Sequence, residues 1–101
     1  MARKGQLNSN EKKAKLIKKH AHKRAELLAF IKDKNTTLAQ RFQAVLKLSA
    51  MPRNSSPSRY RNRCQLTGRA RGYYNRFNVS RIVLRELGSA GMMPGLKKSS
   101  W

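Results

Sequence analysis

The chain has 101 residues, and its 24 lysines and arginines against four acidic residues give it a formal net charge of +20 at pH 7. Acids so few and so scattered argue against an enzyme built on a pair of carboxylates. Because a small soluble domain usually carries a net charge of only about 2 to 8, the composition favours a chain that lies against a polyanion.

The chain has little material for a hydrophobic core of its own. Leucine, isoleucine, valine and phenylalanine make up about a fifth of it, a level at which high net charge indicates disorder. Cys64 is the only cysteine, which excludes an internal disulfide and fits a reducing compartment. No apolar run is long enough to cross a membrane, and no secretory signal is recognisable at the N-terminus. We therefore expect the free chain to be largely disordered and to become ordered on its partner.

The two halves of the chain use different cations. Residues 1–50 hold ten lysines and three arginines, whereas residues 51–101 hold nine arginines and two lysines. Lysine is a hydrated point charge, while arginine is a planar fork that binds phosphate through two bonds and stacks on bases. The sequence therefore predicts two regions: a Lys-rich helical arm with an amphipathic helix over residues 1–52, and an Arg-rich binding module over residues 53–101.

Two helices are predicted in the first region. Asn8 with Glu11 forms a possible capping box that would open a helix running to about Asp33. Thr37 with Gln40 forms a second one, followed by apolar residues at helical spacing. This second helix is expected to end near Met51, before Pro52, and its apolar stripe is Leu38, Phe42, Val45 and Leu46.

The second region is punctuated by turn residues. Residues 54–58 are a loop by composition, and three arginines at alternate positions after it would lie on one side of an extended strand: Arg59, Arg61 and Arg63. Thr67-Gly68 and Arg71-Gly72 predict two tight turns with short hairpin-like strands. Ser80 is expected to cap a last helix from Arg81 to Leu87 that ends at Gly88, and an extended tail follows.

Candidate binding residues are concentrated in this second region. Aromatic rings interleaved with arginines suit stacking on bases or sugars, although Tyr74 and Phe77 are equally consistent with filling a small core. His20 and His22 lie on different faces of the predicted helix and form no metal pair, so we predict no catalytic residue, cofactor or metal site. The predicted binding residues are Arg53, Arg59, Arg61, Asn62, Arg63, Arg69, Arg71, Tyr73, Arg76, Arg81, Arg85, Lys97, Lys98 and Trp101.

Several motifs in a fixed order resemble a known family. Arg61-Asn62-Arg63-Cys64 is followed, after twelve residues, by Phe77-x-Val79-Ser80-Arg81-x-x-x-Arg85. Residues 48–59 and the ending over residues 94–101 carry further similar motifs. In these features the chain resembles the family of small-subunit ribosomal protein fourteen.

One form of that family binds zinc through two Cys-x-x-Cys pairs, and the corresponding positions here are Cys64, Thr67, Ser80 and Val83. A structural zinc site needs four nitrogen or sulfur donors, and only Cys64 is one, so the resemblance implies the long, zinc-free form. The expected fold is mainly α with irregular segments: two N-terminal helices, an extended Arg-rich linker, a small zinc-ribbon-like knuckle without zinc, a short C-terminal helix and an extended tail. The knuckle would be held by the RNA and by Leu66, Val79, Val83 and Leu84.

The resemblance also implies a function. The family's members are structural constituents of the small ribosomal subunit, which bind its rRNA (16S-type) in the head, support assembly and help set rRNA conformation near the decoding A site. The expected partners are this rRNA and the neighbouring small-subunit proteins of families three and ten, with no membrane and no homo-oligomer. The expected location is a cytoplasmic bacterial ribosome or an organellar one. The alternative is a DNA-architectural basic protein, which explains the charge but not the motifs.

Overall fold

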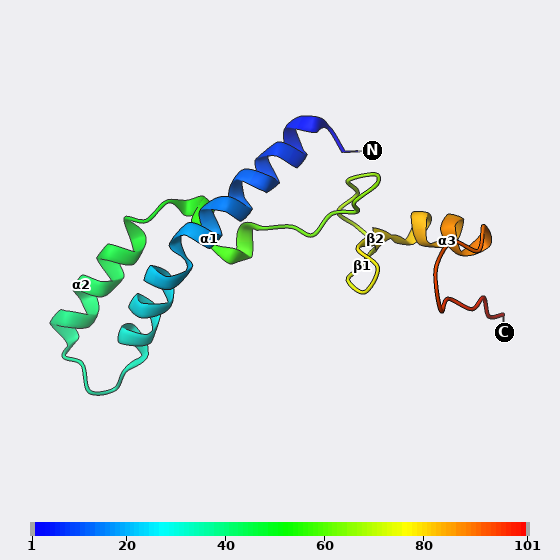
Figure 1. The fold of residues 1–101 in the computed structure, drawn as a ribbon. Coiled ribbons are helices and arrows are strands. Elements are labelled where there is room, and N and C mark those ends of the chain that lie inside the picture. Colours follow the sequence, from blue (N-terminus) through cyan, green and yellow to red (C-terminus); the bar gives the residue numbers. More distant parts are fainter. Residues whose placement is uncertain (1, 101) are drawn as a thin grey trace. The chain divides into compact units, whose positions relative to one another are not determined.

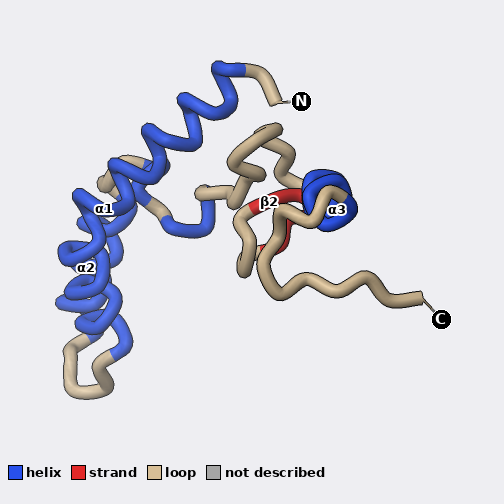
Figure 2. The backbone as a smooth tube through the Cα atoms, turned by 45° about the vertical axis from the view of Figure 1, so that its right-hand side comes forward, coloured by secondary structure: helices blue, strands red, loops and turns tan. Residues whose placement is uncertain are grey.

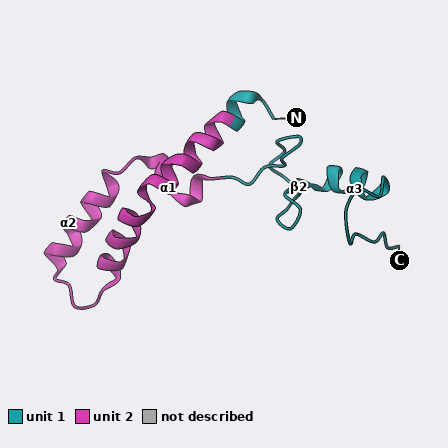
Figure 3. Cartoon of the chain, viewed as in Figure 1, with its two compact units in different colours: residues 1–7, 61–101 teal, residues 8–60 magenta. Residues whose placement is uncertain are grey.

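The computed structural model describes residues 2–100 and divides the chain into two compact units. The first unit is residues 8–60 (magenta, labelled unit 2 in Figure 3), and the second unit joins the N-terminal residues up to Leu7 with the chain from Arg61 onward (teal, labelled unit 1 in Figure 3). The described residues are mainly helical, with three α-helices and one short pair of strands (Figure 1). This confirms the predicted mainly-α class with two N-terminal helices and a short C-terminal one.

The first helix, α1, spans Lys4–Lys32 and begins four residues before the predicted capping box. The expected start at Asn8 is therefore wrong. The backbone carbonyl of Arg3 accepts hydrogen bonds from the N–H groups of Gln6 at 2.9 Å and Leu7 at 3.3 Å, so a turn is already closed before Asn8. No residue of α1 is buried within the chain.

The second helix, α2, spans Leu38–Ser49 and starts with the predicted capping box. The Thr37 hydroxyl accepts from the Gln40 N–H, and the Gln40 side chain accepts from the Thr37 N–H, both at 3.4 Å. α1 and α2 lie side by side in both views, joined by a short loop (Figures 1 and 2). Ala44 is the buried residue of α2.

Two 3₁₀ turns follow α2 in place of an extended linker. They are η1, Arg53–Ser55, and η2, Pro57–Arg59. Ser55 is fully buried, donates to the Pro52 carbonyl and accepts from Arg24 Nε of α1 at 3.0 Å. Because Arg59 ends the second turn, the prediction that it continues an extended strand with Arg61 and Arg63 is wrong; the local prolines and serines favour tight turns instead.

The second unit contains a small hairpin and α3. The strands β1, Tyr73–Tyr74, and β2, Val79–Ser80, pair antiparallel, with Tyr73 opposite Ser80. The predicted glycine turns are present, since Gly68 and Gly72 have φ of 75° and 60°. At Gly68 a Cβ atom would lie 2.9 Å from Cβ of Ala2 and from Cδ2 of Leu7, so only glycine lets the first turn of α1 approach this closely. The Ala2 N–H donates to the Thr67 carbonyl at 3.2 Å.

The last helix, α3, spans Arg81–Ser89 and is capped by Ser80 as predicted, with the Val83 N–H 3.4 Å from the Ser80 hydroxyl. The expected end at Gly88 is wrong, because the helix continues to Ser89 with Ala90 as its cap. Gly91, at φ 71°, donates to the Gly88 carbonyl, and Met92 donates to that of Leu87. These two bonds form a Schellman motif, so Gly91 is the glycine that stops the helix.

The core of this unit is small. Cys64, Val79 and Val83 are buried together, and the partly buried residues packed on them are Phe77, Leu84, Leu87 and Met93. Phe77 therefore serves the core, whereas Tyr74 is half exposed. Leu66 is 66% exposed and takes no part in this cluster, so the expectation that it helps to hold the knuckle is wrong. With only three buried apolar side chains among its described residues, the unit has little apolar burial to offset the entropy of ordering it.

Candidate nucleic-acid interface

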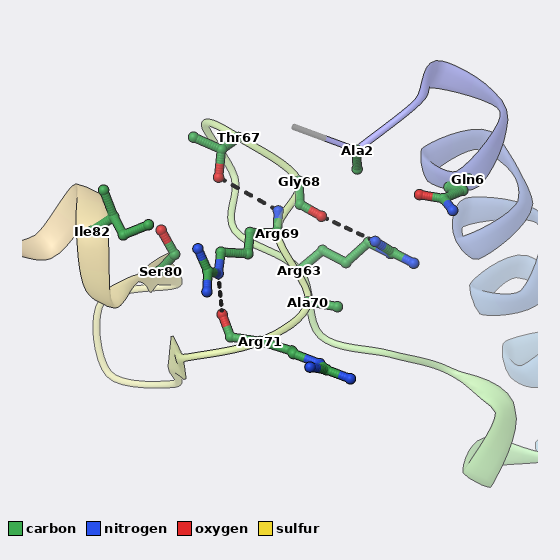
Figure 4. Close-up of a pocket in the computed structure, with 10 residues that line it drawn as sticks. All are labelled: Ala2, Gln6, Arg63, Thr67, Gly68, Arg69, Ala70, Arg71, Ser80 and Ile82. Atoms are coloured by element: carbon green, nitrogen blue, oxygen red, sulfur yellow. Dashed lines mark hydrogen bonds between the residues drawn. The ribbon is translucent and has the colours of Figure 1, made fainter.

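An arginine-lined pocket of about 390 Å³ lies beside the glycine turns of the second unit (Figure 4). Arg63, Arg69 and Arg71 line it, and all three were predicted binding residues. In Figure 4 the guanidinium groups of Arg63 and Arg71 extend to one side of the loop, and that of Arg69 extends to the other. The remaining lining residues are small, polar or apolar: Ala2, Gln6, Thr67, Gly68, Ala70, Ser80 and Ile82.

The turns orient these arginines through their own carbonyl groups. Arg63 Nη1 donates to the Gly68 carbonyl at 3.1 Å, and Arg69 Nε donates to the Arg71 carbonyl at 3.2 Å. Arg61 Nη2 makes a similar bond to the Ala70 carbonyl at 3.4 Å. A guanidinium carries five N–H donors, so a side chain fixed by one bond keeps others for a ligand. The loop therefore presents oriented cationic forks.

One nitrogen of Arg63 makes no hydrogen bond. Its Nε atom is buried and has no hydrogen-bond partner among the described residues. An unsatisfied buried donor costs about 1–3 kcal/mol, and a movement of the side chain toward an oxygen atom in the pocket would remove that cost. The pocket is therefore suited to an anionic or hydrogen-bond-accepting group.

Next to the pocket, the hairpin loop orients two more predicted residues. The Tyr73 hydroxyl donates to Asn78 Oδ1 at 2.7 Å, and Asn62 Nδ2 donates to Asn75 Oδ1 at 3.3 Å. The Arg76 guanidinium carbon lies 5.8 Å from the centroid of the Phe77 ring, within cation–π range. This loop thus carries both polar and cationic groups.

A second basic hollow, of about 370 Å³, lies between α3 and the tail. A Cβ atom at Gly88 would be 2.6 Å from Cδ2 of Leu96, so the tail packs closely against the helix there. This packing brings together four predicted residues from separate segments: Arg81, Arg85, Lys97 and Lys98. Trp101, the last predicted residue, lies outside the described residues.

The residues of the first unit form a separate set. Arg53 and Arg59 lie in its 3₁₀ turns, where Arg59 Nη1 donates to Asn54 Oδ1 at 3.3 Å. A hollow of about 540 Å³ in this unit is lined by His20, Lys23 and Lys47 with residues 50–52. None of these three side chains was among the predicted binding residues. The sequence pattern that could have identified them is weak. His20 and Lys23 are one helical turn apart, but their proximity to Lys47 depends on the packing of α2 against α1.

The sequence of this chain is similar to proteins of known family. The profile described as Ribosomal protein S14p/S29e matches residues 47–100. The chain is 54% identical to a protein named small ribosomal subunit protein uS14 from Xanthobacter autotrophicus, over the full length of both chains. Proteins of the same name from Rhodopseudomonas palustris and Phenylobacterium zucineum are 54% and 52% identical, again over both full lengths.

The chain belongs to the ribosomal protein S14p/S29e family. It is therefore a ribosomal protein with a structural role and not an enzyme. The family match contains both basic hollows of the second unit except the N-terminal residues Ala2 and Gln6. No helix within residues 2–100 is long and apolar enough to cross a membrane.

Cys64 lies close to the other three positions that the resemblance relates to zinc ligands: Thr67 and Ser80 form hydrogen bonds with it, and Val83 is buried in the same cluster. Burial raises the pKa of the Cys64 thiol, but hydrogen bonds from the Thr67 hydroxyl and from backbone N–H groups of Thr67, Ser80 and Leu66 outweigh it and lower the pKa from 9.0 to about 6. Among the described residues, no three His, Cys, Asp or Glu side chains gather to hold a metal. One thiol with threonine, serine and valine does not fit a tetrahedral zinc site.

Proposed function

We propose that this ribosomal protein is a structural constituent of the small ribosomal subunit and binds small-subunit rRNA mainly through the arginines of its second unit. The observation that carries the proposal is the pocket lined by Arg63, Arg69 and Arg71, in which backbone carbonyls orient Arg63 and Arg69 and one nitrogen of Arg63 lacks a protein partner. Such forks suit phosphate oxygens and the edges of unstacked bases. The printed names of the relatives, small ribosomal subunit protein uS14, support the assignment to the small subunit.

In this proposal, different groups of the predicted residues make different kinds of contact with the rRNA. The pocket arginines grip folded RNA, and the α3–tail group of Arg81, Arg85, Lys97 and Lys98 follows a phosphate backbone. The first unit contributes Arg53 and Arg59, while Lys23 and Lys47, which line a hollow with His20, add positive charge that neutralises phosphate. Trp101 would fasten the tail to the RNA. Asn62, Tyr73 and Arg76 complete the surface at the hairpin.

The finer features implied by the family also belong to this proposal. The hairpin and the turn at Thr67 form a zinc-ribbon-like knuckle in which the packing of Cys64, Val79 and Val83 replaces the metal. Its place is the head of the subunit, where it supports assembly and rRNA conformation near the decoding A site. Its protein neighbours are the small-subunit families three and ten. Because the full-length relatives are bacterial, the ribosome is of bacterial type and lies in the cytoplasm.

Nuclease-resolved sedimentation tests the proposal against a DNA-binding role. The endogenous protein is expected to travel with small subunits, to remain with them after DNase treatment and to be released by RNase. Release by DNase, with no small-subunit association, would assign the charge to DNA instead.

A further inference from the structure

The N-terminal segment, residues 2–7, packs on the turn at Gly68, within the same compact unit. The Ala2 N–H donates to the Thr67 carbonyl at 3.2 Å. A Cβ atom on Gly68 would lie 2.9 Å from Cβ of Ala2 and from Cδ2 of Leu7. Two side chains of the N-terminal segment therefore cover this glycine, and no larger residue fits beneath them.

The covered turn contains a position that the resemblance relates to a zinc ligand. Thr67 occupies that position, and its hydroxyl forms a hydrogen bond with the Cys64 sulfur. The Gly68 N–H donates to the Cys64 carbonyl at 2.8 Å, and the Cys64 N–H donates to the Arg69 carbonyl at 2.9 Å. These local bonds close the turn, whereas the N-terminal segment attaches it to a part of the chain that is distant in the sequence.

The N-terminal segment also supplies apolar burial where the knuckle has little. One sulfur donor does not make a tetrahedral zinc site, and Leu66, the leucine of the turn itself, is 66% exposed. Leu7 reaches the turn from α1 and is 39% exposed. Its contact with Gly68 removes apolar surface from water and so stabilises the turn.

The same turn orients an arginine of the proposed rRNA site. Arg63 Nη1 donates to the Gly68 carbonyl at 3.1 Å. Ala2 and Gln6 line the pocket together with Arg63 (Figure 4). Because this hydrogen bond depends on the place of the Gly68 carbonyl, a shift of the turn would also turn the guanidinium. The covered glycine thus connects the N-terminal segment to the pocket.

We propose that the N-terminal segment does for this knuckle what zinc does in the other form of the family: it holds the turn at Gly68 and so positions Arg63 for rRNA. Leu7 is the main positioning residue, and Ala2 adds a backbone hydrogen bond. The segment acts together with the buried cluster around Cys64. This inference rests on the proposed function, because the orientation of Arg63 matters only if Arg63 contacts rRNA.

The first test compares two leucines of α1 with nearly equal exposure. Leu7 contacts the turn, whereas Leu28, 41% exposed, lies in the other unit. Glutamine keeps the charge and nearly the helix propensity of leucine. Leu7→Gln is expected to weaken binding of the chain to a small-subunit rRNA fragment about tenfold, or about 1.4 kcal/mol, and Leu28→Gln less than about twofold. Equal losses from the two variants would overturn the proposal.

A conservative variant and a double-variant cycle separate positioning from a general loss of stability. Leu7→Met keeps the apolar volume and is expected to bind the fragment like the unaltered chain. In a chain that already carries Arg63→Ala, the effect of Leu7→Gln is expected to fall from about tenfold to below about twofold, because both changes act on the same contact. An undiminished tenfold loss in that chain would contradict the positioning role. If the unaltered chain does not bind the fragment, the proposed function itself fails, so the two failures are distinct.

Crosslinking tests the contact itself in purified small subunits. Photo-leucine, a leucine analogue of similar size that carries a diazirine, replaces Leu7 in the full chain. Irradiation is expected to join position 7 to residues 64–69 of the same chain. Adducts with rRNA or with another protein, and none with residues 64–69, would overturn the inference.

Discussion

Replacing Arg61 and Arg63 together by alanine is expected to weaken rRNA binding by about a hundredfold. Each charge-assisted hydrogen bond contributes roughly 1.5–3 kcal/mol, and about 3 kcal/mol in total corresponds to about two powers of ten in affinity. Arg63 lines the pocket and has a buried nitrogen without a partner, while Arg61 is oriented by the Ala70 carbonyl. The measurement is binding of the variant chain to a small-subunit rRNA fragment at fixed salt, followed by its incorporation into subunits.

The matched control is Lys12→Ala with Lys13→Ala, which removes the same charge from α1. These lysines lie on a helix without buried residues, and lysine neutralises phosphate without fixed geometry, so a loss of about tenfold or less is expected. Arg61→Lys with Arg63→Lys separates charge from shape, because it keeps both charges and removes both forks. If alanine at Lys12 and Lys13 weakens rRNA binding as much as alanine at Arg61 and Arg63, the central role of the pocket is contradicted.

Restoring the three missing cysteines is expected to create a zinc site. In the variant Thr67→Cys, Ser80→Cys, Val83→Cys, three new thiols would lie around that of Cys64, which already accepts hydrogen bonds from Thr67 and from the Ser80 backbone. Structural zinc in comparable small modules binds with an apparent free energy of about 10 kcal/mol or more. This exceeds the roughly 1 kcal/mol lost with the Ser80 cap. The variant is expected to hold one zinc per chain by elemental analysis, with a thermal transition that a chelator abolishes.

The control for this site keeps Ser80 and changes only Thr67 and Val83. With three thiols instead of four, the double variant is expected to bind zinc far more weakly, and the unaltered chain is expected to bind none. If the triple variant binds no zinc, or no more tightly than the double variant, then the knuckle does not have the zinc-ribbon-like geometry that we propose.

Structural features that depend only on residues close together in the sequence, such as helix caps, could be predicted. The Thr37–Gln40 capping box and the Ser80 cap are bonds between a side chain and a backbone group three residues away, and both are present. The start of α1 could not be read in the same way. The contacts at its first turn come from Arg3 and from the turn at Thr67, far along the chain.

The end of α3 at Gly91 is a second feature that could not be predicted from the sequence. Gly88 and Gly91 are equally suitable glycines in the sequence, and only the conformation of Gly91 with its two backbone bonds decides between them. The orientation of the apolar stripe of α2 is a third feature that could not be predicted from the sequence. Its spacing predicts the helix, but not whether the stripe faces α1 or solvent, because that depends on which face α1 covers.

The sequence predicted which types of residue form the candidate site, but not how the fold groups them. A stretch rich in arginine and free of acidic residues indicates a nucleic-acid-binding surface, so individual arginines could be named as candidates. The grouping of Arg63, Arg69 and Arg71 into one pocket with Gln6 depends on the close approach at Gly68. The grouping of Lys97 and Lys98 with Arg81 depends likewise on the tail folding back on α3.

Crosslinking inside intact small subunits tests the central claim most directly. After ultraviolet irradiation and digestion of purified subunits, peptides within residues 61–85 are expected to carry covalently attached rRNA nucleotides. Enrichment of these adducts over those from α1 would place the RNA contact in the second unit. The absence of rRNA adducts from residues 61–85, with adducts confined to α1, would contradict the proposed function of the arginine pocket.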